Sequence, residues 1–354
     1  MLGGYWLLRV RREFPPARAF EVITGFCDWH HTRTKRKSGM LLNEIEIHFH
    51  FGDGPLPSFL ELWFLFLLLL SPLCRAQDEA TGAPAPEPPS IQDNSFLIEE
   101  AYNQEDGVIQ HINSFLRLTQ SHDWMFTETD EWPVRCLKHQ LSITLMAAHA
   151  GNFPDSGAGW GDTALNYRYQ LLGSGQAKLA VAPRLSLLLP TGESATGRGL
   201  GGLGLQTNLP VSVQHSSHWT THWNAGATWV PRARNELGES ASVMATNLGQ
   251  SIVWLAKPRI NFLVETYWSA GESVVGVHKT QWSQDLYVSP GIRWAFNFRN
   301  GLQIVPGIAV PIGVGPSAGE KGMIFYLSFE HPFALAHSKI ESGASREPGG
   351  EDPD

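Results

Sequence analysis

The chain has 354 residues, of which 42% are hydrophobic and 17% charged, and its mean hydropathy is -0.16. The slightly negative mean hydropathy excludes a helical protein that crosses a membrane several times. Low charge without high hydropathy is typical of a barrel whose lipid-facing and lumen-facing residues alternate. The net charge of -8 argues against a nucleic-acid partner.

The first part of the chain differs in charge from the rest. Residues 1–76 hold nine basic and seven acidic residues, whereas residues 77–354 hold 17 and 27. The run FLELWFLFLLLL at 59–70 is too short for a membrane helix, which needs about 20 residues. It fits the apolar region of a signal peptide over residues 59–76, with cleavage before Gln77.

A signal peptide normally begins a protein, yet residues 1–58 precede this one. We therefore expect these residues to be a mis-called extension, with the true start near residues 40–62. The alternative is a genuine, unusual leader. N-terminal sequencing of the exported protein separates the two, because a mature chain that retains residues 1–50 contradicts the first.

Residues 77–106 form the next segment. Residues 78–90 are a linker rich in Pro, Ala and Glu that cannot bury a core. Residues 91–106 carry Phe96, Leu97, Ile98 and Tyr102 at loosely helical spacing. This pattern indicates either a small plug inside a barrel or a periplasmic helix.

From residue 107 to residue 333 the hydrophobic residues alternate with polar ones, as in strands. About twelve such segments occur, each long enough for a tilted membrane strand. A soluble β-sandwich would also alternate, but the many tryptophans of this region would then need a common core. At two membrane interfaces they need none. The sequence thus predicts an all-β fold, a transmembrane antiparallel β-barrel of about twelve strands in a bacterial outer membrane.

Charged residues on the polar faces of these strands must point inward, because charges facing lipid cost a few kcal/mol each. They line either a paired, water-filled or plugged interior or a selectivity constriction. The lumen-facing candidates are Lys178, Arg168, Arg184, Arg259, Arg293, Arg299, Asp162, Glu265, Asp285 and Glu330. Prolines at 183, 290 and 306 have no backbone N–H to donate to a neighbouring strand, and bulges at these positions would be consistent with that.

The last predicted strand ends in an aromatic residue and resembles the C-terminal assembly signal of outer-membrane barrels. The residues of this signal are Gly322, Phe325, Leu327, Phe329 and Phe333. Residues 334–354 follow it, and their polar, Gly/Pro-rich composition indicates a disordered periplasmic tail.

Motifs for catalysis and cofactor binding are weak. Gly199–Gly204 matches GxGxxG, but a strand-like stretch follows where a dinucleotide site needs a helix. His218 and His222 would lie roughly 13 Å apart on a strand, too far to share a metal ion. HExxH does not occur, and GxSxG occurs only as GPSAG at 315–319. We expect no catalytic residue, metal or cofactor.

Several stretches, among them GDTALNYRYQLL (161–172), SPGIRWAFNF (289–298) and YLSFEHPF (326–333), resemble a known group. They are similar to the transporter-like outer-membrane proteins of the MetA-pathway phenol-degradation family. The resemblance implies a non-enzymatic channel or passive transporter for small, hydrophobic or aromatic molecules. The alternatives are a structural barrel with a closed lumen and, third, a barrel enzyme acting on lipids. The expected partners are outer-membrane lipids, the barrel-assembly machinery and a small-molecule solute.

Overall fold

The computed structural model describes residues 91, 94–134, 136–151, 157–174, 177–298 and 301–332. The predicted leader, signal peptide, linker and tail, together with Phe333, lie outside these residues, so their boundaries stay predictions. In the described part of the chain, no helix is long and apolar enough to cross a membrane.

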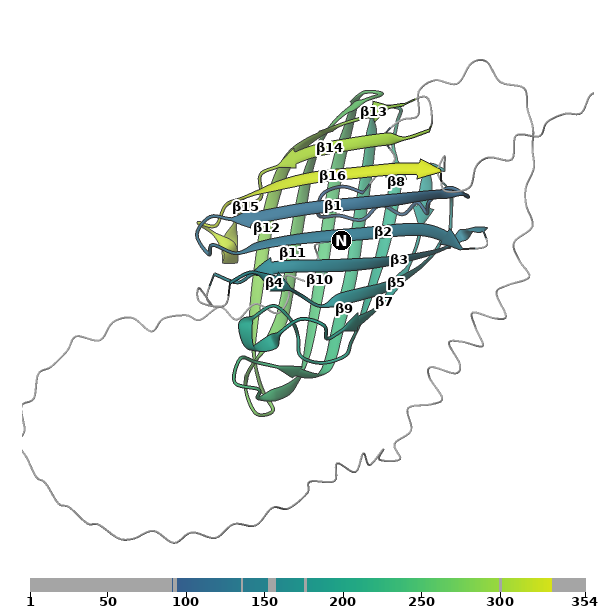
Figure 1. Cartoon of the computed structure of the whole chain (residues 1–354). Helices are drawn as coiled ribbons and strands as arrows, with labels where there is room; N and C mark the ends of the chain where they lie inside the picture. The colour runs from purple at the N-terminus through teal and green to yellow at the C-terminus, as the bar shows by residue number, and fades with distance from the viewer. Residues whose placement is uncertain are drawn as a thin grey trace, which may run out of the picture. The chain divides into compact units, whose positions relative to one another are not determined.

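The fold is built from antiparallel strands (Figure 1). Four of the twelve staves of the barrel are each interrupted, so that two consecutive strands make up one stave: β4 with β5, β6 with β7, β12 with β13, and β14 with β15. The sixteen strands therefore form a closed barrel of twelve. The strands are β1 (Val108–Leu118), β2 (Trp124–Val134), β3 (Cys136–His149), β4 (Gly159–Trp160), β5 (Thr163–Tyr169), β6 (Leu179–Val181), β7 (Arg184–Leu189), β8 (Gly204–Gln214), β9 (Trp219–Arg234), β10 (Ser240–Lys257), β11 (Ile260–Gly276), β12 (Lys279–Trp294), β13 (Phe296–Asn297), β14 (Gln303–Ala309), β15 (Ile312–Gly313) and β16 (Gly322–Pro332). Two single 3-10 turns, η5 (Ser194–Thr196) and η6 (Gly315–Ser317), lie in connections.

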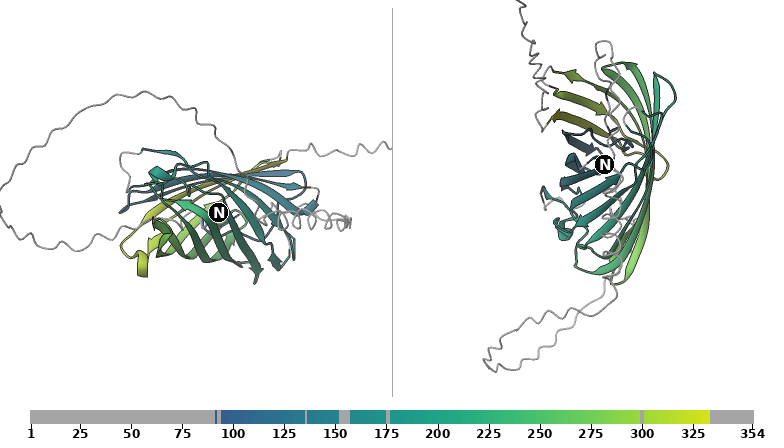
Figure 2. Two further views of the ribbon diagram at one scale, coloured as in Figure 1. Left: turned by 90° about the horizontal axis from the view of Figure 1, so that it is seen from below. Right: turned by 90° about the vertical axis from the view of Figure 1, so that its right-hand side faces the viewer.

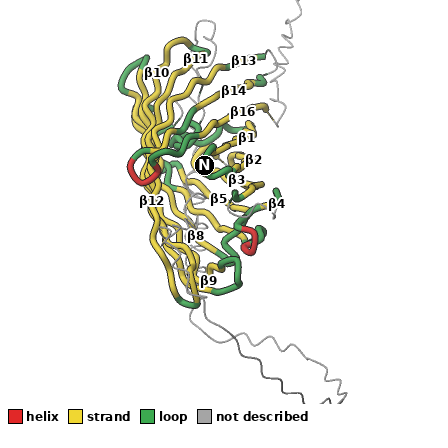
Figure 3. Tube along the Cα trace, turned by 90° about the vertical axis from the view of Figure 1, so that its left-hand side faces the viewer, coloured by secondary structure: helices red, strands yellow, loops and turns green. Residues whose placement is uncertain are grey.

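The barrel closes between its first and last strands. β16 pairs with β1 over its whole length, from Val108 opposite Pro332 to Leu118 opposite Gly322. On its other side β16 pairs with β14, which in turn pairs with β12. Figures 2 and 3 show β8–β12 curving opposite β1–β5, β14 and β16. No sheet edge therefore remains open along the ring of twelve strands.

The two ends of the barrel differ. β1 begins and β16 ends at the same end, where β2 and β3 are joined by one residue and β10 and β11 by residues 258–259. The longest connection, residues 190–203, lies at the opposite end. Because outer-membrane barrels have short periplasmic turns and longer outer loops, the first is the periplasmic end and the second the outer end.

Side chains alternate between lumen and outer wall along each strand. On β11, Asn261 and Glu265 are buried inside, whereas Phe262 and Val264 are 43% and 46% exposed on the outside. The same pattern leaves large apolar residues exposed on the outer wall of most strands. Exposure of so wide an apolar belt to water would be unfavourable, so the outer wall faces lipid. A closed barrel with an even number of antiparallel strands and this belt is an outer-membrane barrel.

One part of the outer wall is polar instead. His111 on β1 lies opposite Asp130 on β2, and its ring Nδ1 is 2.5 Å from the Asp130 carboxylate. Phe329 of β16 stacks on the His111 ring with 4.7 Å between ring centroids. Pairing of the two groups offsets part of the cost of placing them on the lipid-facing side.

The expected bulges at prolines are only partly present. Pro183 separates β6 from β7. Pro290 and Pro306 keep continuous register with Val264 and Leu327, so the prediction of bulges there is wrong. On the side of β12 that faces β14 and β15, the pairing is interrupted at Pro290. Residues 291–293 pair with β14 and residues 287–288 with β15.

Candidate functional site: a plug segment in the barrel lumen

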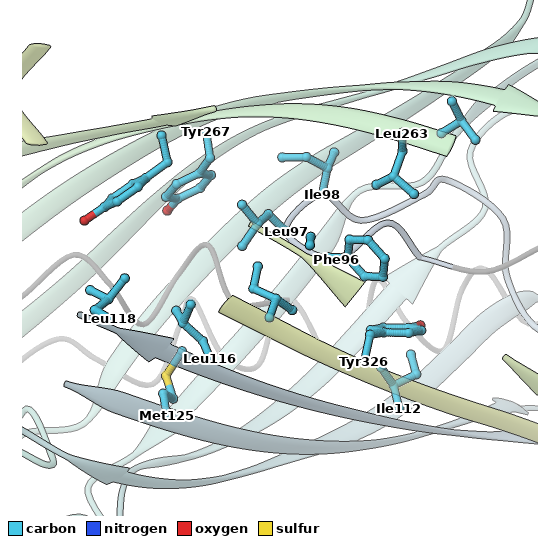
Figure 4. Close-up of a cluster of buried hydrophobic side chains, with 14 of the residues drawn as sticks. Phe96, Leu97, Ile98, Ile112, Leu116, Leu118, Met125, Leu263, Tyr267 and Tyr326 are labelled. Carbon is cyan, nitrogen blue, oxygen red and sulfur yellow. The ribbon is translucent and has the colours of Figure 1, made fainter. Parts of the chain in front are cut away.

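Residues 94–104, the plug segment, lie inside the barrel. The segment forms neither helix nor strand, so the spacing of Phe96, Leu97, Ile98 and Tyr102 does not produce a helix. Phe96 is 2% exposed, and Ile98 and Ala101 are fully buried. Figure 4 shows Phe96, Leu97 and Ile98 surrounded by side chains of the wall. Of the two alternatives left by the sequence, the structure has the plug.

Side chains of the wall bind the backbone of the plug segment. Glu265 Oε1 accepts the N–H groups of Leu97 and Ile98 at 2.8 and 3.0 Å. Asn224 pairs with Glu99 in both directions, accepting its N–H at 2.9 Å and donating to its carbonyl at 2.8 Å. Irregular backbone is found at membrane depth only where other groups of the protein, or water, bind its N–H and C=O groups. Here the polar side chains of the lumen do so.

The same arrangement continues toward β1. Ser212 Oγ accepts the N–H of Ala101 at 2.8 Å, and the Gln170 amide bonds both Ala101 O and Asn103 N–H. Gln140 Oε1 accepts the N–H of Gln104 at 2.7 Å. Since Ser212 lies in β8, Gln140 in β3 and Gln170 directly after β5, the plug segment is anchored to the wall on the β1–β8 side.

Buried charges fix the middle of the plug segment. The Glu99 carboxylate lies 3.0 Å from Arg184 Nε and 3.6 Å from Arg168 NH1. Asn208 Nδ2 donates to it at 2.6 Å. Arg168 also lies 3.6 Å from Glu131. Two arginines and two glutamates thus form a buried cluster with no net charge, which limits the desolvation penalty.

Apolar groups of the wall also contact the plug segment. Phe96 packs edge-on against Tyr326 of β16, with ring centroids 5.3 Å apart. A cluster joins the plug segment to inward residues of the wall, several of them toward the outer end. Its wall members include Ile112, Leu116, Leu118, Met125, Met146, Leu263, Tyr267, Tyr287, Ile324 and Tyr326.

Seven of the ten predicted lumen charges fall into three groups, according to whether they lie beside the plug segment, at the outer end or at the periplasmic end. Arg168, Arg184, Arg293 and Glu265 are inside the barrel and contact the plug segment. Asp162 is buried at the outer end and accepts the N–H groups of Gly192 and Leu200. At the same end Asp285 accepts the Ser317 hydroxyl, and Glu330 is half-buried near the periplasmic end of β16.

Two of the candidates do not face the lumen. Lys178 and Arg259 are exposed and lie in the turns before β6 and between β10 and β11, so their prediction as lumen-facing is corrected. A residue in a short turn escapes the alternation that orients side chains within a strand. Arg299 lies outside the described residues.

Sequence reasoning missed several groups of this site. Glu131, Asn224 and Gln140 are buried lumen residues that bind the plug segment or its partners. Alternation could have identified Asn224 and Gln140. It fails for Glu131, because the run TETDEW at 127–132 is polar on both faces.

The predicted assembly signal lies on β16 with its apolar residues outward. Phe325 and Leu327 are 49% and 42% exposed to the lipid side. Gly322 lies inward, where a Cβ would come 2.6 Å from the Arg117 carbonyl oxygen. Phe333 is outside the described residues, so the assembly role stays a prediction.

The weaker motifs take ordinary places. The motif Gly199–Gly204 ends at the first residue of β8, and no helix follows it. His222 is buried and bonds Ser212 Oγ at 2.7 Å, while His215 and His218 lie exposed in the β8–β9 turn. Among the described residues no group of three His, Cys, Asp or Glu could hold a metal ion.

Two solved outer-membrane proteins and one family model are similar to this chain. The chain is similar to the COG4313 outer membrane channel from Pseudomonas putida F1 at 10% identity, with TM-score 0.47 over 65% of this chain and 97% of that one. It is also similar to the NanC porin at 9% identity, with TM-score 0.41 over 62% and 98% of the two chains. No curated protein matches. The family model described as "Putative MetA-pathway of phenol degradation" matches residues 109–311, more than half of the chain. The chain therefore belongs to this family.

Proposed function

We propose that the protein is a non-enzymatic passive channel of the bacterial outer membrane for small hydrophobic molecules, aromatic ones included. The observation that carries the proposal is a lumen lined partly by apolar and aromatic side chains and occupied by a hydrogen-bonded plug segment. A porin for polar solutes has a polar, water-filled interior instead. The family description, which names phenol degradation, supports the aromatic class.

Many contacts of the plug segment can be replaced by contacts with water. Besides the ion pairs of Glu99 and the apolar contacts of Phe96, Leu97 and Ile98, they are hydrogen bonds to side chains, each worth a net ~1 kcal/mol, since water offers the same partners once the segment leaves. The segment is continuous with β1 only through residues 105–107. A small change in free energy of the plugged state would therefore change how often the lumen is open.

A structural barrel with a permanently closed lumen is the second candidate. The buried Glu99 cluster favours it, because opening would separate Glu99 from Arg168 and Arg184 unless water hydrates all three.

The test is a deletion of residues 94–104, with deletion of residues 334–354 as the matched control. We expect the first variant alone to show increased single-channel conductance in planar bilayers and faster entry of toluene and phenol into vesicles. Heat-modifiable migration of both variants in SDS gels checks that the barrel folds. A folded plug-deleted barrel that neither conducts nor admits solute would favour the structural role.

A barrel in the outer membrane has two further expected partners, lipids and the assembly machinery. We propose that outer-membrane lipids cover the apolar outer wall and that the barrel-assembly machinery receives the edge of β16. Both agree with the exposed apolar residues on that strand.

A further inference from the structure

Phe96 fits into a space in the wall that exists because two neighbouring strands carry glycine. A Cβ added at Gly291 of β12 would lie 2.5 Å from Phe96 Cε2, and one at Gly307 of β14 would lie 2.7 Å from Phe96 Cζ. Tyr326 completes the site with an edge-on contact at 62° between the ring planes. We name Gly291, Gly307 and Tyr326 the Phe96 socket.

The far edge of the Phe96 ring, rather than its stem, is what the glycines accommodate. The atoms nearest the missing Cβ positions are Cε1, Cε2 and Cζ. The socket therefore matches the outline of a free six-membered ring. Its occupant is at present a side chain of a segment that is otherwise held by hydrogen bonds.

Two buried polar atoms lie next to the socket. Ser289 is the next inward residue along β12 from Gly291, about 7 Å away, and it pairs with Glu265 on β11. Ser289 Oγ and Glu265 Oε2 have no hydrogen-bond partner among the described residues. Both side chains are fully buried. Unpartnered buried polar atoms are costly unless a ligand or water uses them.

The contact at Ile98 provides a comparison within the same segment. Gly249 of β10 makes room for Ile98 Cδ1 as the other glycines do for Phe96. That position has an aliphatic branch as its occupant, and no aromatic ring packs edge-on there among the contacts described. It is therefore a matched control for the socket.

We propose that the Phe96 socket is a binding site for a single-ring aromatic compound, which competes with Phe96 and so releases the plug segment. The inference rests on the proposed function, because the ligand must reach the lumen. A ligand that binds only when Phe96 is out shifts the population toward the released state. A ring hydroxyl would meet Ser289 Oγ and Glu265, so phenol should bind more tightly than toluene.

Binding is tested without transport, by 19F NMR of fluorobenzene with purified protein in lipid nanodiscs. We expect Phe96→Ala to bind fluorobenzene about two- to tenfold more tightly than fluorocyclohexane, as an edge-on ring pair predicts. Leu97→Ala should show no such binding. Equal binding by Leu97→Ala, or none by a folded Phe96→Ala, would overturn the proposal. If Phe96→Ala does not fold, Phe96→Leu replaces it and should bind more weakly.

Filling the socket separates it from any other cavity. Phe96→Ala with Gly307→Ala should lose the fluorobenzene signal, whereas Phe96→Ala with Gly249→Ala should keep it. The opposite result would place the ligand elsewhere and contradict the proposal.

Release of the plug segment is tested in the otherwise native chain with Ser95→Cys, since Ser95 is 1% exposed. Toluene, and more so phenol, should raise the rate of maleimide labelling severalfold, whereas methylcyclohexane should not. The chain without Ser95→Cys gives the background from native cysteines. Equal rates with and without toluene would contradict the competition. Ring binding without solute entry would count against the proposed function alone.

Discussion

Glu99 is the charged residue that ties the plug segment to the wall, through Arg184 and Arg168. We expect Glu99→Gln to weaken the plugged state by about 3 kcal/mol, because two arginines would lose the carboxylate they face in a buried site. Single-channel recording should show a higher open probability. Glu105→Gln is the control, since Glu105 is exposed beside the same segment. An unchanged open probability for Glu99→Gln would show that the cluster does not hold the plug.

Glu320 organises the outer end of the barrel through backbone donors. Its carboxylate accepts the N–H groups of Thr119, Gln120 and Ser121. Burial raises the pKa of Glu320, but hydrogen bonds from Gln120, Ser121 and Lys321 outweigh it and hold the pKa below the ordinary value of 4.5. A carboxyl whose pKa is lower in the folded state stabilises that state above the unfolded pKa, and the contribution is lost as the pH falls through the folded pKa.

The pH dependence can be measured on the β1–β2 turn. We expect the amide signals of Thr119 and Gln120 to change only below about pH 4. In Glu320→Gln the same signals should be insensitive to pH in that range. A transition of the turn near neutral pH would mean that another group controls it.

Among the elements, β16 combines closure of the barrel with the predicted assembly signal. Its eleven residues pair with β1 on one side, and it faces lipid with Phe325 and Leu327. We expect deletion of Ala334–Asp354 to be tolerated, whereas Phe333→Ala reduces the amount of heat-modifiable barrel in outer-membrane fractions. If the deletion alone abolishes insertion, Phe333 is not the functional end of the barrel.

The plug segment shows what an element without regular structure can do. Its backbone groups bind lumen side chains of β3, β8, β9 and β11 and of Gln170, directly after β5, rather than a neighbouring strand. Such partners position the segment without making it a strand of the sheet, which is consistent with its proposed release.

The whole barrel depends on its apolar outer wall. Leu248 lies at the middle of β10 and is 54% exposed to lipid. We expect Leu248→Arg to lower the free energy of unfolding in lipid vesicles by about 2–4 kcal/mol. Leu237→Arg should have little effect, because Leu237 is exposed in the β9–β10 loop. Equal effects of the two variants would argue against a lipid-facing wall at β10.

The sequence by itself determined the barrel, its approximate strand number and the orientation of strand residues such as Arg293 and Glu265. Alternation suffices for these, because a strand sends successive side chains to opposite faces. It could not orient Lys178 or Arg259, which lie in turns, nor Glu131 in a run that is polar on both faces.

Only the tertiary structure decided what the lumen contains. The spacing of Phe96, Leu97, Ile98 and Tyr102 allowed a plug or a helix, and nothing local distinguishes them. The choice depends on partners more than 100 residues away, such as Asn224, Ser212 and Glu265, whose side chains bind the irregular backbone inside the barrel. The glycines that receive Phe96 are likewise distant in sequence, so their common role appears only when β12 and β14 pair.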